Sequence, residues 1–377
     1  MEINHIGTIA IESEKTNREL KSIGGISGYI LELINYSILK NIKVGFIGKI
    51  YNYKKSSGIN YIQVQKNVSS TNLFLINLFL KSLLSKVNKS SIIHAHRPDH
   101  LAAFLFFKKR NSVITLHGQQ AHTVNIRKGR ITRFIYKMLE SYAFNKTNAL
   151  IAVDSITQEF YSTLYPQHKN KILTISTGVN TTLFYPMDKI TCRLKLGLKN
   201  TDKVIIYVGR VEPPKRLDLI IEAFSILSKE DNSYKLIIVG DGVSMKDMEL
   251  LTSKHNLKGH VFFLGVRKRI ELPELFSAAD VSILISGNEG SPLSVKESLA
   301  CGIPVVANNV GDIPEVISNF KNGFIVSTKI NEIAEKLKQA VNNSSQLKKN
   351  CVNSIQNYSI EKVSQKVLSL YKEILSE

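Results

Sequence analysis

Two carboxylates, Glu289 and Glu297, stand eight residues apart around a turn of small residues. The apolar run 281–286 before them is typical of a buried parallel strand, and 303–307 after them is typical of the next. The turn therefore lies at the carboxyl end of a strand and opens a short helix that ends at Gly302. Backbone N–H groups at such an edge can bind phosphate. We expect Glu289 at the mouth of a ligand site and Glu297 inside the helix; the alternative is two surface glutamates beside a core helix.

A second pair of candidates carries positive charge. The apolar strand 204–208 ends in Gly209 and Arg210, and Lys215 follows five residues later. Arginine offers a planar fork to phosphate oxygens and lysine a mobile point charge. At the end of a strand they could clamp a diphosphate and neutralise charge on a departing nucleoside diphosphate. The alternative is two solvated cations.

The first half offers histidines and glycines at strand ends. His117 follows the strand 112–116 and precedes a glycine, where it could hydrogen-bond a sugar hydroxyl or a developing charge near neutral pH. His94 and His96 lie two apart on a strand and face the same way. Because no carboxylate or third histidine stands at a diagnostic spacing, we expect no metal there, and place His96 at the rim of a cleft. Gly24 and Gly25 precede a helical pattern and would let the backbone approach a diphosphate closely.

Several of these motifs resemble one family. Glu-x7-Glu followed by Ala-Cys-Gly-x-Pro-Val-Val-Ala resembles the nucleotide-sugar-binding signature of retaining glycosyltransferases of family GT4, which have the GT-B fold. The Gly-Arg…Lys pattern, the Thr-x-His-Gly motif and the early Gly-Gly pair are similar to the same family. The resemblance is strong over 204–317, moderate over 93–186 and weaker before. The chain departs from it at Asn180, where relatives carry aspartate, and at Asp154, where many carry serine.

The resemblance implies a retaining glycosyltransferase that moves a sugar from a nucleotide-sugar donor, with a UDP-sugar favoured, to a glycan or lipid-linked acceptor. Arg210 and Lys215 would bind the diphosphate, and Glu289 would face the sugar. His117 would lie beside the reacting sugar, and Glu297 would hold the ribose hydroxyls. Together with Glu297, the donor-binding set would comprise Gly24, Gly25, Gly209, Arg267, Gly290, Ser291, Pro292, Leu293 and Ser294.

We expect no cofactor and no metal requirement. No Asp-x-Asp motif occurs, and the cationic clamp could replace a divalent ion. Catalysis would then be positioning and electrostatics, with the acceptor attacking the face that the diphosphate leaves. That stereochemistry is implied by the resemblance alone.

The order of strands and helices sets the expected architecture. Strand and helix patterns alternate along 377 residues, which predicts an α/β chain with mainly parallel sheets and two domains. The resemblance implies GT-B: two Rossmann-like β/α/β domains facing each other across a deep cleft. We expect an acceptor-binding domain over 1–185, a nucleotide-sugar-binding domain over 186–358 and a final helix, 359–377, that crosses back to the first domain.

Composition indicates a soluble, cytoplasmic protein. The chain is 43% hydrophobic, no apolar run approaches the roughly 18 residues that a membrane span needs, and no signal peptide is evident. Its three cysteines show neither disulfide nor metal spacing. The net charge of +19 is uneven, because residues 1–185 hold 24 Lys and Arg against 9 Asp and Glu. This indicates an anionic partner: phospholipid, a diphosphate-linked acceptor or nucleic acid. No RNA- or DNA-binding motif occurs, so we expect no nucleic acid.

The segment 127–144 combines basic residues with apolar residues at helical spacing, namely Phe134, Ile135, Met138, Leu139 and Tyr142. Such a helix could lie on an anionic surface at the inner face of the cytoplasmic membrane. The alternative is a core-facing helix with a charged outer side.

Two other classes share the architecture. A pyridoxal-phosphate phosphorylase would need a Schiff-base lysine in its own motif, and none is seen. A non-catalytic nucleotide-sugar-binding or scaffold protein would lose the acceptor side, against which His117 and the Gly24-Gly25 pair argue. Abundant Lys, Asn and Ile indicate an AT-rich microbial genome and suggest surface-polysaccharide or lipopolysaccharide biosynthesis.

Overall fold

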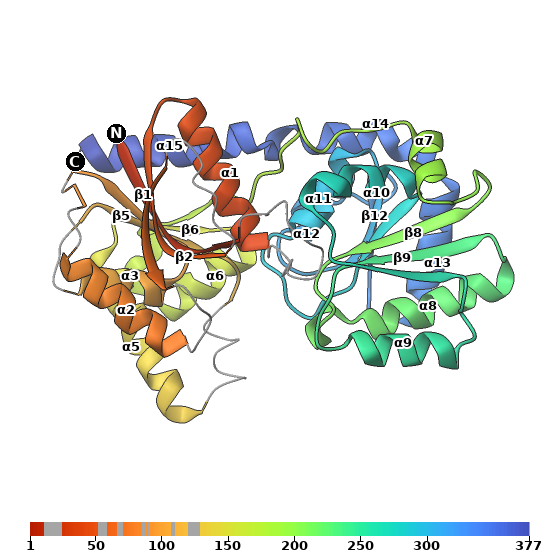
Figure 1. Cartoon of the computed structure of the whole chain (residues 1–377), viewed down its shortest axis with the longest axis horizontal. Coiled ribbons are helices and arrows are strands. Elements are labelled where there is room, and N and C mark those ends of the chain that lie inside the picture. Colours follow the sequence, from red (N-terminus) through yellow and green to blue (C-terminus); the bar gives the residue numbers. More distant parts are fainter. Residues whose placement is uncertain are drawn as a thin grey trace. The chain divides into compact units, whose positions relative to one another are not determined.

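The chain forms two parallel sheets, and helices cover each of them (Figure 1). The computed structural model describes residues 1–10, 25–51, 59–65, 71–84, 87–88, 90–106, 110–119 and 129–376. By their internal contacts these residues divide into two compact units. Unit 1 contains the described residues up to Thr177 and those from Ile360 on, and unit 2 contains Gly178–Ser359. The division into 1–185, 186–358 and 359–377 as domains stays a prediction.

The sheet of unit 1 has seven strands in the order β3-β2-β1-β4-β5-β6-β7, with every neighbouring pair parallel. Its strands are β1 (Glu2–Ala10), β2 (Lys43–Tyr51), β3 (Ile59–Gln65), β4 (Ile92–Ala95), β5 (Ser112–Leu116), β6 (Ala149–Ala152) and β7 (Ile172–Thr174). The central strands β4, β5 and β6 are buried along their whole length. This burial explains why their sequences are mostly apolar.

Helices cover both faces of this sheet. On one face lie α1 (Gly25–Leu39) and α15 (Ile360–Ser376), which share an apolar core with β1, β4, β5 and β6. The other face is covered by α2 (Thr71–Leu84), α3 (Pro98–Leu105), α5 (Arg130–Lys146) and α6 (Ser155–Leu164), and the short turn η1 (Pro166–Lys171) leads into β7. The last helix of the chain thus completes the core of the first unit.

The sheet of unit 2 has six parallel strands in the order β10-β9-β8-β11-β12-β13. They are β8 (Lys203–Val208), β9 (Tyr234–Val239), β10 (Val261–Gly265), β11 (Val281–Leu284), β12 (Val305–Asn308) and β13 (Gly323–Val326). One continuous apolar core fills this unit.

Two groups of helices enclose the second sheet (Figure 1). One group is α8 (Leu217–Glu230), α9 (Met245–Lys254) and α13 (Ile330–Asn342). The other is α7 (Lys189–Lys195), α10 (Leu272–Ala278), α11 (Leu293–Ala300) and α14 (Ser344–Ser354). Short connecting turns are η2 (Pro213–Lys215), η3 (Arg269–Glu271), α12 (Ile313–Val316) and η4 (Gln356–Tyr358).

In both sheets the strand order reverses beside the first strand. The reversal lies between β1 and β4 in unit 1 and between β8 and β11 in unit 2. Ligands of doubly wound sheets bind outside the carboxyl ends of the strands at such a reversal. The loops after these four strands are therefore where site residues are expected.

The expectation of an α/β chain with two Rossmann-like parts is confirmed. Within the described ranges, no helix is both long enough and apolar enough to span a bilayer.

Candidate functional site

The loops after β8 and β11 in unit 2 meet through a cation and a carboxylate. Lys215 ends the turn η2 after β8, and its ammonium forms an ion pair with Glu289 in the loop after β11. Both side chains are largely buried, 15% and 11% exposed. The structure thus brings together two residues that the sequence singled out 74 positions apart.

Hydrogen bonds join the same two loops through their backbones. The carbonyl oxygen of Pro214 accepts from the N–H of Gly287 at 2.8 Å and from the hydroxyl of Ser286 at 3.1 Å. Asn308, at the end of β12, binds both backbone groups of Ser286 at 2.8 Å. These hydrogen bonds link the ends of three neighbouring strands. They therefore fix the loops that carry Lys215 and Glu289.

Glu297 lies inside α11, as expected, and is 5% exposed. Its carboxylate accepts a hydrogen bond of 3.0 Å from the guanidinium of Arg269, which also lies over the ring of Phe184. Arg269 was missed from the sequence, which pointed to Arg267 instead; Arg267 is exposed. The only sequence feature that pointed to Arg269 was its position in the same basic loop after β10.

A buried ion pair stabilises the turn of residues 290–294. Lys296 and Asp312 are 0% and 1% exposed and lie 2.6 Å apart. The Lys296 ammonium also donates to the hydroxyl of Ser291, which donates to Asp312 at 2.7 Å. The backbone N–H of Asp312 donates to the carbonyl of Gly290 at 2.8 Å. A lysine amid the apolar residues of a helix was the signal that sequence reasoning passed over.

At two positions of this region the geometry leaves no room for a side chain larger than that of glycine. A Cβ on Gly209 would lie 2.8 Å from the hydroxyl oxygen of Tyr207. Gly311 has a positive φ of 55°, and its Cβ would lie 1.9 Å from the carbonyl oxygen of Gly290. Any other residue at 311 would displace the turn.

The second predicted cation is placed differently from Lys215. The Arg210 side chain is 53% exposed and forms a 2.8 Å ion pair with Glu212. Its carbonyl oxygen accepts from Tyr207 at 2.7 Å, which fixes the backbone while the guanidinium extends outward. Of the other predicted residues, Pro292 and Leu293 are buried, whereas Gly290, Ser291 and Ser294 are half-buried.

In unit 1, His117 directly follows β5 and His96 directly follows β4, next to it in the sheet. His96 Nδ1 and His117 Nε2 are hydrogen-bonded at 3.2 Å, and the ring of Tyr29 stands edge-on against both imidazoles. Burial lowers the pKa of His117 to about 3, so the ring is neutral at physiological pH. A neutral imidazole can donate or accept a hydrogen bond but carries no charge for an anionic ligand.

Only one glycine of the predicted pair can be placed. Gly24 falls outside the described residues, and Gly25 is the exposed first residue of α1. Among the described atoms, none lies within 4 Å of where a Cβ on Gly25 would be. Packing of the described residues therefore does not explain this glycine.

Unit 2 carries several polar groups in the loops after its strands: two cation–carboxylate pairs, Lys215 with Glu289 and Arg269 with Glu297, and a turn that opens α11. Such groups can bind anionic oxygens and hydroxyls at the same edge of the sheet.

Comparison with known proteins identifies both halves of the chain. Residues 23–183 match the family described as "Glycosyltransferase Family 4", and residues 188–358 match "Glycosyl transferases group 1". Together these two matches cover most of the chain.

Among curated relatives, an Escherichia coli UDP-Gal:alpha-D-GlcNAc-diphosphoundecaprenol alpha-1,3-galactosyltransferase is 28% identical over 78% of this chain and 80% of its own length. A D-inositol 3-phosphate glycosyltransferase of Segniliparus rotundus is 24% identical over 64% of this chain and 56% of its own length. The chain thus spans little more than half of the latter relative.

Among solved structures, the sucrose-phosphate synthase of Thermosynechococcus elongatus aligns with a TM-score of 0.82 and 20% identity, covering 100% of this chain and 99% of that one. This likeness shows a shared fold and confirms the expected GT-B class. From the two family matches and the relatives, the chain belongs to the family 4 glycosyltransferases.

Proposed function

We propose that this protein is a retaining glycosyltransferase that moves a sugar from a UDP-sugar to a glycan or lipid-linked acceptor. The observation that carries the proposal is the Lys215–Glu289 pair at the strand reversal of unit 2, with Glu297 held nearby in α11. Membership of the glycosyltransferase family supplies the reaction class.

In the proposed reaction, Lys215 and Arg210 bind the diphosphate. The bond between the sugar C1 and the phosphate oxygen breaks, and its electron pair leaves with the nucleoside diphosphate. The acceptor hydroxyl oxygen forms the new bond on the same face, and its proton passes to the departing phosphate oxygen. Both cations stabilise the negative charge that grows on the leaving group.

The two glutamates bind different parts of the donor. On this proposal Glu297 accepts hydrogen bonds from the ribose hydroxyls and Glu289 accepts them from the sugar. Gly290, Ser291, Leu293 and Ser294 supply backbone N–H groups, with Pro292 shaping the turn. The loops that contain Gly209 and Arg267 contact the remaining parts. His117 and the Gly24–Gly25 segment act on the reacting sugar. The positive charge that a metal supplies elsewhere comes from Lys215 and Arg210, so we propose that neither metal nor cofactor is required.

The name of the Escherichia coli relative supports the choice of substrates. That enzyme is described as using UDP-Gal and a diphosphoundecaprenol-linked sugar. By analogy we propose a UDP-sugar donor, a lipid-diphosphate or glycan acceptor, and a place in surface-polysaccharide or lipopolysaccharide biosynthesis.

Helix α5 supports a membrane-bound acceptor. Its apolar residues fall into two groups: Leu139 and Tyr142 pack against the core, but Phe134, Ile135 and Met138 are 65%, 51% and 57% exposed. The exposed group continues through Ile131, which is 78% exposed, and lies among basic side chains of the same helix.

Helix α2, on the same face of the sheet, exposes further apolar side chains: Leu73, Ile76, Leu80, Leu83 and Leu84. Phe106 connects the two helices, because its ring contacts Phe79 of α2 and Tyr142 of α5. Exposed apolar residues among cations are typical of a surface that docks on anionic lipid. We propose that unit 1 associates peripherally with the inner face of the cytoplasmic membrane, and that the protein is otherwise cytoplasmic.

The first experiment is a thermal-shift panel with UDP, GDP, ADP and CMP in the presence of EDTA, on the wild type and on Glu297→Ala. A ligand at a hundredfold its Kd stabilises the folded state by about 2.7 kcal/mol. We expect UDP alone to raise the wild-type midpoint, and the variant to lose most of that rise. Another nucleotide in its place would overturn the proposed donor.

The reaction itself is tested with UDP-sugars and a lipid-diphosphate sugar acceptor, by determining the anomeric configuration of the product with proton NMR. The expected product keeps the donor configuration without added metal. Inversion would overturn the mechanism, and nucleotide binding without transfer to any acceptor would favour the non-catalytic alternative.

A further inference from the structure

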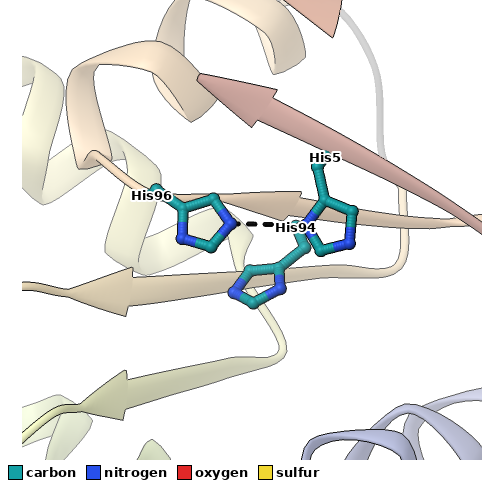
Figure 2. A group of neighbouring side chains, drawn as sticks. All are labelled: His5, His94 and His96. Atoms are coloured by element: carbon teal, nitrogen blue, oxygen red, sulfur yellow. Dashed lines mark hydrogen bonds between the residues drawn. The ribbon is translucent and has the colours of Figure 1, made fainter. Parts of the chain in front are cut away.

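Three imidazoles of unit 1 form a hydrogen-bonded chain that ends at His117. His5 Nδ1 lies 3.3 Å from His96 Nε2, and His96 Nδ1 lies 3.2 Å from His117 Nε2. Figure 2 shows the first of these links as a dashed line. Because the middle ring uses both nitrogens, the proton position on each ring determines that on the next.

The sheet places the three rings. His5 in β1 is the register partner of His94 in β4, and His96 follows two residues later. His117 follows β5, which pairs with β4. Tyr29 of α1 stands edge-on against the rings of His96 and His117, at centroid distances of 6.1 and 5.6 Å. Three neighbouring strands and one helix thus fix the geometry.

All three rings are neutral at physiological pH. Burial lowers the pKa of His5 and of His117 to about 3, and lowers that of His96 well below its usual range. A neutral imidazole has one N–H and one lone pair. The chain therefore has two states: all N–H groups point toward His117, or all point away from it.

The buried end of the chain distinguishes these states. His5 is 0% exposed, and its Nε2 has no hydrogen-bond partner among the residues that the structure describes. If the N–H groups pointed away from His117, His5 would bury an unpaired N–H at this atom. If they point toward His117, only a lone pair stays unpaired. Among backbone groups, a buried N–H without a partner is rarer than an under-satisfied acceptor, and we apply the same order to the imidazole.

We propose that His96, anchored by His5, is a positioning residue that holds His117 in the tautomer with its proton on Nδ1. His117 Nε2 then accepts from His96, and Nδ1–H is the donor left for a ligand. With the proposed function, this donor meets a hydroxyl oxygen of the sugar that is transferred. A donor fixed before the reaction needs no reorganisation while the bond between the sugar and the phosphate breaks. The sugar contact rests on the proposed function, but the tautomer does not.

A metal ion is the competing occupant of this cluster. His5, His94 and His96 each place one nitrogen within 4.8 Å of the others, and three histidines are a known zinc-binding set. However, both nitrogens of His94 already have partners, Thr115 Oγ1 at 2.7 Å and the Tyr371 hydroxyl. A metal would have to break one of these bonds and one of the two links that His96 forms, to His5 or to His117, whereas the imidazole chain uses every contact as it stands.

The tautomer is measured by long-range ¹H–¹⁵N NMR on protein labelled at the histidine ring nitrogens, without substrate. The His117 signals are assigned by their loss in His117→Gln. In the wild type we expect a protonated Nδ1 and an unprotonated Nε2 at His117. A protonated Nε2, or a mixture, in the folded wild type would overturn the proposal even if no variant of His96 folds.

Three variants test the cause. His96→Phe keeps the ring shape but removes the donor, so we expect a tautomer mixture at His117. His96→Asn retains an N–H near the position of Nδ1, and we expect it to restore the wild-type tautomer at least in part. His94→Gln changes the neighbouring ring outside the chain, and we expect it to leave His117 unchanged. An unchanged tautomer in His96→Phe would count against the chain.

Kinetics and metal analysis complete the test. Loss of one fixed hydrogen bond in the transition state should lower kcat about tenfold in His96→Phe with little change in donor KM, because about 1.4 kcal/mol is one factor of ten. Stoichiometric metal in the purified protein, removed by His5→Phe, would replace the imidazole chain with a metal site. A protein with the expected tautomer but no transfer would contradict only the proposed function.

Discussion

At the scale of residues, both carboxylates of the glutamate pair are held by cations in the structure. Glu289 is paired with Lys215, and Glu297 with Arg269, in each case with largely buried side chains. Under the proposed function, a diphosphate would take the place of Glu289 as the partner of Lys215 and leave that carboxylate for the sugar hydroxyls. Ion pairs of this kind hold side chains in position before the ligand binds, which reduces the reorganisation that binding requires.

Lys215→Met should therefore abolish transfer with little loss of stability. Methionine keeps most of the side-chain volume but removes the charge, and losing one preorganised group that stabilises developing charge lowers kcat by roughly 100-fold or more. Lys254→Met, at an exposed position at the end of α9, is the matched control. Initial rates and thermal midpoints of both variants check this. Full activity of Lys215→Met would refute the role of the lysine.

Glu140 should make the stability of unit 1 depend on pH. Its buried carboxyl group accepts hydrogen bonds from Tyr165 at 2.9 Å and Tyr161 at 3.3 Å. Burial nevertheless raises the pKa of Glu140 to about 7. Because the folded pKa is raised, its contribution to stability is present below the ordinary pKa of 4.5 and is lost as pH rises to about 7.

Glu140→Gln, which keeps a hydrogen-bond acceptor without the charge, should remove that dependence. Relative to the wild type, the variant should gain up to about 3 kcal/mol between pH 5 and pH 8. Urea unfolding across this range, followed by a signal from unit 1, measures the difference. A difference between the proteins that does not change with pH would show that Glu140 is ionised in the folded state throughout.

At the scale of elements, α5 is a helix with apolar residues on two sides. Tyr136, Ala143 and Phe144 face the core, and Ile131, Phe134 and Met138 face outward. The sequence predicted the helix and its apolar spacing, but a period of 3.6 residues cannot tell which apolar side packs inward when both exist. Packing against α3 decides it.

Replacing the outward side should weaken membrane binding. For Ile131→Ser, Phe134→Ser and Met138→Ser combined, we expect at least a tenfold loss of affinity for vesicles of phosphatidylcholine and phosphatidylglycerol, since burial of each such side chain contributes about 1.5 kcal/mol or more. The matched control replaces three exposed apolar residues of unit 2, Val243, Leu250 and Ile270, by serine. Vesicle co-sedimentation measures both. Equal losses in the two triple variants would contradict a specific surface on α5.

The order and start of several elements were predictable, whereas the partners of their side chains were not. Mostly apolar runs marked the central strands, and the turn before Leu293 correctly indicated that Glu297 lies within a helix. The positions of these elements follow from local pattern. The pairing of His5 with His96, 91 residues apart, depends on strand register, which no local pattern contains.

The same limit applies to the donor site. The position of Lys296 among apolar residues of a helix was visible in the sequence, but only the folded unit shows it buried against Asp312. The sequence does not distinguish Arg267 from Arg269. In the structure, the turn η3 places Arg269 next to Glu297. Residue types and their strand ends were therefore visible in the sequence, while the ion pairs that hold them required the tertiary structure.

At the scale of the whole molecule, the two units depend on chain order in different ways. Among the residues that the structure describes, those of unit 2 form one continuous stretch, Gly178–Ser359, whereas unit 1 includes the C-terminal helix α15. This helix buries Val363, Val367 and Tyr371 in the core beneath β1, β4, β5 and β6. The first unit is therefore complete only after the second has been made.

Deleting α15 should unfold unit 1 and spare unit 2. The helix contributes five buried side chains to the core, Val363, Val367, Leu370, Tyr371 and Ile374. At about 1.5 kcal/mol or more for each, their loss is comparable with the roughly 5–15 kcal/mol that stabilises a whole domain. Chain 1–359 should therefore lose the unit 1 signal in thermal unfolding and become sensitive to protease there, while UDP still raises the midpoint of unit 2. Tyr371→Phe in the full chain is the control, because it removes only the hydroxyl that contacts His94. A protease-resistant unit 1 in the shortened chain would show that α15 covers a core that is already sufficient without it.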